Sequence, residues 1–123
     1  MRVRAILIGT KFIVTPDPVN VLVGEPVFWE FVSDLPIYNI LWEIYFQGGE
    51  PFGQGLSNLK ANTIGAHSTP LGAVGPIARP THLGLSPSAV ASKPGDYKYG
   101  IRAMDMDSNQ LLGDDDPYLM VLP

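Results

Sequence analysis

An alternation of large apolar and other side chains over residues 39–47 constrains the fold more than any other feature of the chain. The apolar side chains recur at every second position, at Ile40, Trp42, Ile44 and Phe46. Successive side chains of a β-strand point to opposite faces, so a period of two predicts a strand with one face in a hydrophobic core. The opposite face would carry Asn39, Leu41, Glu43, Tyr45 and Gln47.

Shorter alternating segments predict further strands over 19–23, 27–31, 97–103 and 118–122. An opening strand over 2–8 would continue over 12–15 after a break at Gly9. The 13 glycines and 12 prolines among 123 residues favour turns and loops over helices. We therefore predict an all-β protein, an antiparallel β-sandwich whose core is anchored by the inward-facing Trp29 and Trp42.

A chain of 123 residues fits one domain, so we predict a single domain over 1–123. Between residues 51 and 92 only Lys60 and Arg79 carry charge, and glycine, proline, serine, threonine and alanine are frequent. This composition predicts a long Gly/Pro-rich, loop-rich insertion over 51–95, between the central and the C-terminal strands. A loop of this length in a compact domain is expected to be packed or functional.

Two segments resemble a known protein family. The segment 21–31, VLVGEPVFWEF, is similar to the strand–turn–strand V-x-x-G-[DE]-x-V-x-[WF] of the cupredoxins, the plastocyanin-like proteins. The segment 94–99, PGDYKY, resembles the P-G-x-Y-x-[YF] motif that leads into the copper-binding loop of that family. Together with the strands around them, these segments cover about half of the chain. The resemblance implies a Greek-key β-sandwich of the cupredoxin type.

The resemblance also implies where copper would bind, and the strong ligands are missing there. The position of the cysteine ligand falls near Ile101, and the chain contains no cysteine. The first histidine ligand would fall in the segment 35–40, LPIYNI, and no histidine follows Ile101 either. Met104 and Met106 follow, but a thioether alone is the weak axial ligand of a blue-copper site. We therefore expect neither type 1 copper nor electron transfer through it.

An acidic segment near the C-terminus is the candidate metal site. Its oxygen-bearing side chains have the spacing of ligands in a calcium-binding loop, at Asp105, Asp107, Asn109 and Asp116. Two residues depart from that pattern, because Gln110 stands where the loop has glycine and Asp116 replaces a longer glutamate. The alternative is a solvated hairpin connection in which Asp and Asn form the turn. Calcium is the only cofactor that the sequence suggests.

Apolar side chains also stand on the outward faces of the two consecutive central strands, and we treat four of them as candidate interface residues, Phe28, Val32, Leu41 and Tyr45. Leaving them in water would forgo a few kcal/mol of stability, so we expect a cover. The segment 48–93 could fold back over them, or a second copy could form a homodimer. A small-molecule pocket beneath 51–92, with polar contacts from Tyr38, Glu43 and Tyr45, is a further arrangement.

The sequence contains no nucleophile elbow, phosphate loop or dinucleotide fingerprint, and no acid separates His67 from His82. A net charge of −4 argues against nucleic acid as a partner, and no apolar run is long enough to span a membrane. We therefore predict a non-catalytic interaction module that binds an unknown protein or a second copy of itself. Calcium or small-ligand binding is the alternative function. The cytoplasm is the expected compartment, with an exported mature chain as the alternative.

Overall fold

The computed structural model describes the backbone of residues 1–33, 39–62, 66–70 and 78–123, and their side chains except at 62, 66–70 and 78–83. Within these residues the secondary structure is all β. The strands are β1 (Arg2–Ile8), β2 (Lys11–Thr15), β3 (Val19–Leu22), β4 (Pro26–Ser33), β5 (Ile40–Phe46), β6 (Asn58–Asn62), β7 (Ala66–Pro70), β8 (Ala78–Leu85), β9 (Ala89–Val90), β10 (Gly95–Asp105), β11 (Gln110–Asp115) and β12 (Tyr118–Leu122). In the described part of the chain, no helix could cross a membrane.

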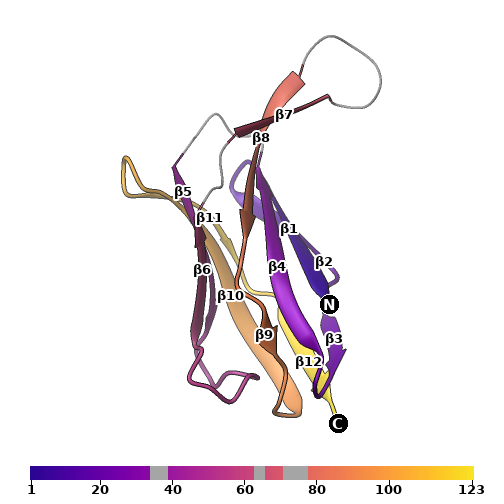
Figure 1. The fold of residues 1–123 in the computed structure, drawn as a ribbon. Coiled ribbons are helices and arrows are strands. Elements are labelled where there is room, and N and C mark those ends of the chain that lie inside the picture. Colours follow the sequence, from indigo (N-terminus) through magenta and orange to yellow (C-terminus); the bar gives the residue numbers. More distant parts are fainter. Residues whose placement is uncertain (34–38, 63–65, 71–77) are drawn as a thin grey trace.

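The strands form two sheets that pack face to face (Figure 1). Sheet I has the order β2-β1-β4-β8-β7, with β9 also pairing to β4. Sheet II has the order β3-β12-β10-β5-β6, with β11 also pairing to β10. The β-sandwich that the sequence predicts is confirmed. Its sheets are mixed, because β1 is parallel to β4 and β3 is parallel to β12.

The parallel pairs arise because the chain changes sheets between neighbouring strands. After the β1–β2 hairpin the chain crosses to sheet II for β3 and returns to sheet I at β4, which then runs beside β1 in the same direction. Gly9, at φ +63°, forms the turn of that hairpin. The segment 12–15 therefore turns back against β1 and does not continue it, because the left-handed turn at Gly9 reverses the chain.

Aromatic contacts between the two sheets form the centre of the core. Trp29 of sheet I meets Tyr99 of sheet II edge to face, with ring centroids 5.4 Å apart. Phe31 of sheet I stacks on Trp42 of sheet II, at 5.3 Å and an interplanar angle of 9°. All four side chains are buried. The two tryptophans are thus core anchors, as the sequence predicts, since β4 and β5 each turn their alternate large side chains inward.

Strands occupy much of the segment for which the sequence predicts a loop-rich insertion, residues 51–95. β6 pairs with β5, and β8 pairs with both β4 and β7, so these strands extend the two sheets. The segment therefore does not fold back over the outer faces in its described part. Sequence periodicity missed β6 and β8 because the backbone ladder to a neighbouring strand can hold a strand without a strict alternation of apolar side chains.

Candidate functional site

The end of the sandwich that would hold copper in a cupredoxin is closed by a hairpin. Ile101, at the position of the cysteine ligand, is fully buried on β10 and pairs with Ile44 of β5 and Asp115 of β11. β10 does not open into a ligand loop after Ile101 but continues to Asp105, and β11 then pairs back along it. An aliphatic side chain inside a continuous ladder has no donor for a metal, so this position contributes core packing only.

The structure separates the four residues of the predicted calcium site. Asp105, Asp107 and Asn109 lie in or next to the β10–β11 turn, where Asn109 adopts a left-handed φ of 57°. Asp116 lies past the other end of β11, beyond the position that pairs with Ile101. Four residues of strand separate Ile101 from Asp105, which is about 13 Å. Asp116 therefore does not converge with the other three, and no group of three histidine, cysteine, aspartate or glutamate side chains that could hold a metal ion occurs within the described ranges.

The turn residues instead satisfy one another. The Asp107 backbone N–H donates to Oδ1 of Asp105 at 3.0 Å, and Nδ2 of Asn39 donates to Oδ1 of Asp107 at 3.2 Å. The Met106 backbone N–H donates to the Asn39 carbonyl at 2.9 Å. Asp and Asn side chains form such local bonds in solvated turns, so the geometry fits the hairpin connection that the sequence left open as the alternative.

The outer face of sheet II carries a polar cluster around Glu43. This buried carboxylate lies on β5 between Arg102 of β10 and Lys60 of β6, which are its direct cross-strand neighbours. Arg102 donates to Oε1 through both Nε and Nη2, while Asn58 Nδ2 donates to Oε2 at 2.9 Å and the Lys60 ammonium lies 3.9 Å from Oε2. Both carboxylate oxygens are thus bound to protein groups, and the cluster stabilises this face without an outside ligand.

Tyr45 covers a gap in the same face. A Cβ atom built on Gly100 would lie 2.0 Å from Cζ of Tyr45 and 2.4 Å from both Cε atoms, so the ring lies flat on the glycine. The Arg102 guanidinium lies over the ring, 4.8 Å from its centroid. The sequence predicts Tyr45 as an interface residue, whereas in the structure the aromatic ring fills the space that Gly100 leaves and packs against a cation.

An open depression of about 380 Å³ lies beside Tyr45. Its side chains are a mixture of phenol, amide, carboxylate and ammonium groups, from Tyr45, Gln47, Asp96, Tyr97, Lys98 and Asp116. None of its lining residues belongs to the segment 51–92. This depression is therefore a different site from the pocket that the sequence predicts beneath that segment. Tyr38, another polar contact predicted for that pocket, lies outside the described residues.

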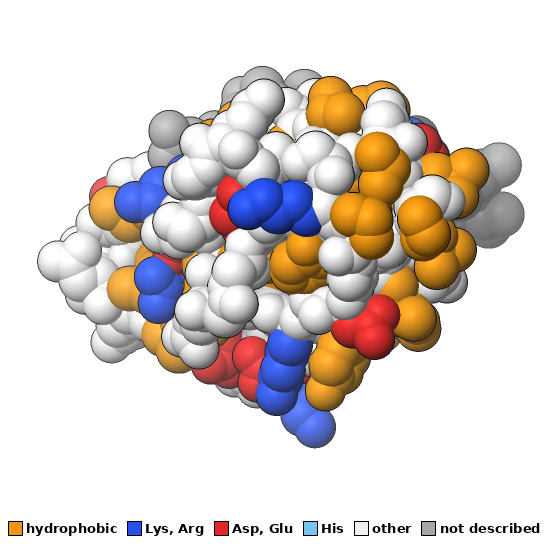
Figure 2. Space-filling view, turned by 90° about the horizontal axis from the view of Figure 1, so that it is seen from below, with side chains coloured by type: hydrophobic (Ala, Val, Ile, Leu, Met, Phe, Trp, Pro, Cys, Tyr) orange, Lys and Arg blue, Asp and Glu red, His pale blue; other side chains and the backbone are white. Residues whose placement is uncertain are grey.

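The outer face of sheet I differs from that of sheet II in its side chains. Ile6 of β1 pairs with Ile13 of β2 on one side and with Val32 of β4 on the other, so these three side chains form an apolar band across the strands. Ile8 follows one outward position further along β1. Ile8 is 55% and Ile13 is 53% exposed. Further exposed apolar side chains lie on β3, β12 and the turn after β3, at Leu22, Val23 and Leu122, and Figure 2 shows hydrophobic side chains on the right of that end of the molecule.

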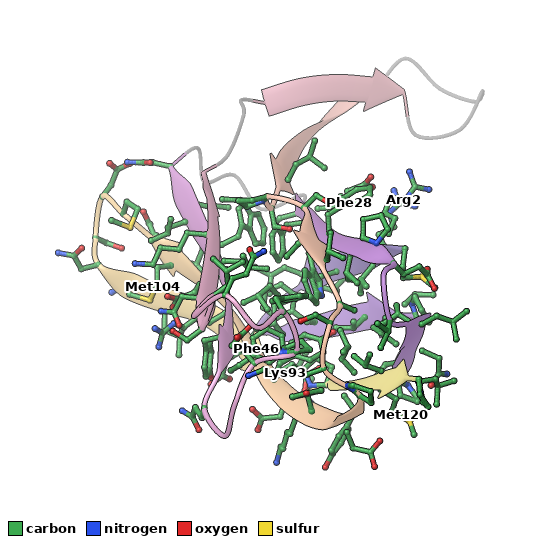
Figure 3. All side chains as sticks on the ribbon, turned by 60° about the horizontal axis from the view of Figure 1, so that its bottom comes forward. Arg2, Phe28, Phe46, Lys93, Met104 and Met120 are labelled. Atoms are coloured by element: carbon green, nitrogen blue, oxygen red, sulfur yellow. The ribbon has the colours of Figure 1, made fainter. Side chains whose placement is uncertain are left out.

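Cations lie on both sides of the apolar band. On β1, Arg2 and Arg4 precede the isoleucines, and both contact the Glu30 carboxylate of β4, at 3.6 and 3.3 Å. Lys11 of β2 is exposed and pairs with Ile8 at the other side of the band. Figure 3 shows Arg2 beside Phe28, on the opposite side of the sandwich from Met104. The face is therefore both apolar and cationic.

The four predicted interface residues lie on two different surfaces. Phe28 and Val32 are half-buried on the outer face of sheet I, while Leu41 and Tyr45 are half-buried on the outer face of sheet II. They cannot form one patch, because β4 and β5 follow one another in the chain but belong to opposite sheets. Sequence reasoning missed Ile6, Ile8 and Ile13. A signal for the two residues of β1 was present, because inward and outward side chains alternate along this strand and the alternation places Ile6 and Ile8 outward.

Comparison with known proteins supports the fold. The chain matches the structure of auracyanin A, a blue copper protein from the green thermophilic photosynthetic bacterium Chloroflexus aurantiacus, with a TM-score of 0.50 and 14% identity over 99% of this chain and 98% of the other. It also matches an oxidised amicyanin mutant, with a TM-score of 0.36 and 15% identity over 98% of this chain and 82% of the other. No protein-family profile matches the chain, and no curated protein sequence matches it.

The fold is therefore that of a cupredoxin, as the sequence motifs imply. Within this fold the chain has no cysteine, and Ile101, near which the sequence resemblance places the thiolate ligand, is buried. It is a cupredoxin-like β-sandwich that lacks the ligand set of type 1 copper.

Proposed function

We propose that this chain is a non-catalytic interaction module whose binding surface is the outer face of sheet I. The apolar band across β2, β1 and β4 supports the proposal. Ile8 and Ile13 keep more than half of their surface in water, although the domain has a complete core. Burying such a side chain in a complex stabilises it by about 1 kcal/mol, at roughly 25 cal/mol per Å². The outer face of sheet II offers less binding energy to a partner, because Glu43 at its centre is already paired with side chains of the same chain.

The alternative function, calcium or small-ligand binding, has less support. Its acidic residues do not converge, and the depression next to Tyr45 is open to solvent and lies outside the segment 51–92. A contiguous apolar surface on an otherwise charged exterior more often marks a protein contact.

Retention of partners from a cell extract tests the proposal. We expect the wild-type chain, immobilised at its C-terminus, to retain proteins that the double variant Ile8→Ser, Ile13→Ser loses. Leu122→Ser is the matched control, since Leu122 is 45% exposed and points outward from β12 of sheet II, away from this face. If wild-type, double-variant and control chains all retain the same proteins, or if none retains any, the outer face of sheet I is not the binding surface.

A further inference from the structure

We infer that the partner of the outer face of sheet I is an acidic amphipathic helix of another protein; this rests on the proposed function of that face. The inference combines the charges of the face with the width of its apolar band. The described charged side chains on the face are three cations, Arg2, Arg4 and Lys11, and one carboxylate, Glu30. Three positive charges and one negative charge leave a local charge of +2 on a chain whose net charge is −4.

The charge of the face disfavours a second copy as its occupant. Face-to-face packing by a two-fold axis across the band would place the cations of one copy against cations of the other, whether arginine meets arginine or arginine meets Lys11. Glu30 offers little compensation, because its carboxylate is only 17% exposed and already contacts both arginines of its own chain. Like charges across an interface act against the wrong partner, whereas carboxylates would complement Arg2 and Arg4, which stay 63% and 55% exposed.

The width of the apolar band fits one helix. From Arg4 to Ile8 the strand rises four residues, about 13 Å. A helix with its side chains is about 10–12 Å across, so one helix can lie over the band with its apolar stripe on Ile6 and Ile13. Carboxylates on one flank of that helix would then reach the arginines, and carboxylates on the other flank would reach Lys11. A helix packed on the apolar face of a sheet is an ordinary two-layer arrangement.

An anionic bilayer fits the face less well than a protein helix. Charged side chains adjoin the apolar band on this face, because Arg4 precedes Ile6 by two residues on β1 and pairs with Glu30 of β4. Along β1 the band contains only Ile6 and Ile8 after Arg4, which is little apolar surface for insertion into the hydrocarbon of a membrane. The carboxylate of Glu30 would also face the lipid phosphates.

The test is a titration of the isotope-labelled chain with two synthetic helical peptides, in which NMR chemical shifts of the backbone amides report binding. Both peptides carry leucine on one stripe, flanked by glutamate in the first and by lysine in the second. We expect the glutamate peptide to shift amides of β1, β2 and β4 and to bind at least about ten-fold more tightly than the lysine peptide. Added salt should weaken the binding of the glutamate peptide, because exposed charges more than about 10 Å apart are screened at 0.1 M ionic strength.

Variants assign the binding to this face. Ile13→Ser and Arg4→Gln should each weaken binding of the glutamate peptide several-fold, while Leu122→Ser, on the outer face of sheet II, should leave its affinity unchanged. Equal affinity for the two peptides, shifts on another face, or no binding at the highest soluble peptide concentration would overturn the inference. So would binding to vesicles of phosphatidylcholine and phosphatidylglycerol without binding to the peptide. If Ile8 and Ile13 are required for partner retention but the glutamate peptide does not bind, the proposed interaction surface is retained and the acidic helix is rejected as its partner.

Discussion

Removal of one hydroxyl group from the core is a direct test of how the two sheets are joined. The Trp29 indole N–H of sheet I donates to the Tyr99 hydroxyl of sheet II at 3.3 Å, and both side chains are buried. Tyr99→Phe deletes the acceptor but keeps the ring, so the edge-to-face contact at 5.4 Å remains. The indole N–H is then left buried without this partner, which costs about 1–3 kcal/mol of unfolding free energy.

Urea unfolding followed by tryptophan fluorescence measures this loss. We expect a lower midpoint at an unchanged slope, and a melting temperature lower by about 3–6 °C for each kcal/mol. Tyr118→Phe is the control, because Tyr118 is 50% exposed and its change should stay within about 0.5 kcal/mol. If Tyr99→Phe unfolds at the wild-type midpoint, the bond between the sheets contributes nothing and the reasoning is refuted.

The same hydroxyl group predicts how stability depends on alkaline pH. Burial raises the pKa of the Tyr99 phenol above its ordinary value of 10.0. Because the pKa is higher in the folded than in the unfolded chain, the unfolded chain loses this proton first, and stability falls as the pH rises above about 10. The unfolding free energy of Tyr99→Phe should fall less steeply over that range. Equal slopes for the two proteins would contradict the assignment.

Three further changes test the core, the outer face of sheet II and the hairpin. Gly84→Ala would place its Cβ 2.6 Å from Cδ1 of Trp42, so the indole must shift from its stack; we expect a loss of about 1–3 kcal/mol in urea unfolding. Arg102→Met removes two hydrogen bonds from the buried Glu43, and because Arg102 is 43% exposed we expect a loss of only about 1–2 kcal/mol by thermal unfolding. Stoichiometric Cu(II) should give no intense blue absorption band, since Ile101 replaces the thiolate; such a band would contradict the reading of this position.

Local periodicity predicted the strands that carry a strong alternation. The strands over 2–8 and 118–122 coincide with β1 and β12, and the run over 39–47 contains β5. These segments place one side chain in two in the core, which leaves a pattern in the sequence itself. β6, at the edge of sheet II, and β8, between β4 and β7 in sheet I, leave no such pattern, because the backbone ladder to a neighbouring strand holds them.

The candidate surfaces could be predicted only in part. Phe28 and Val32 point outward as the alternation of β4 requires, and Leu41 and Tyr45 do so on β5. Which outward residues share a surface depends on strand order, and the chain crosses from one sheet to the other between β4 and β5. The positions of the acidic residues depend on strand extent in the same way, because a spacing that suits a compact loop places Asp116 at the far end of a strand once β11 extends.

The amino-acid sequence by itself determined the strands with alternating apolar side chains, the inward position of the tryptophans and the absence of a copper thiolate, because each of these depends on residue type or on a period of two. The tertiary structure alone decided that Ile6, Ile13 and Val32 form one band between cations. Those residues come from three strands, and only the hydrogen-bonded register of β2, β1 and β4 aligns them. Register and strand order are properties of the whole chain, so no local pattern contains them.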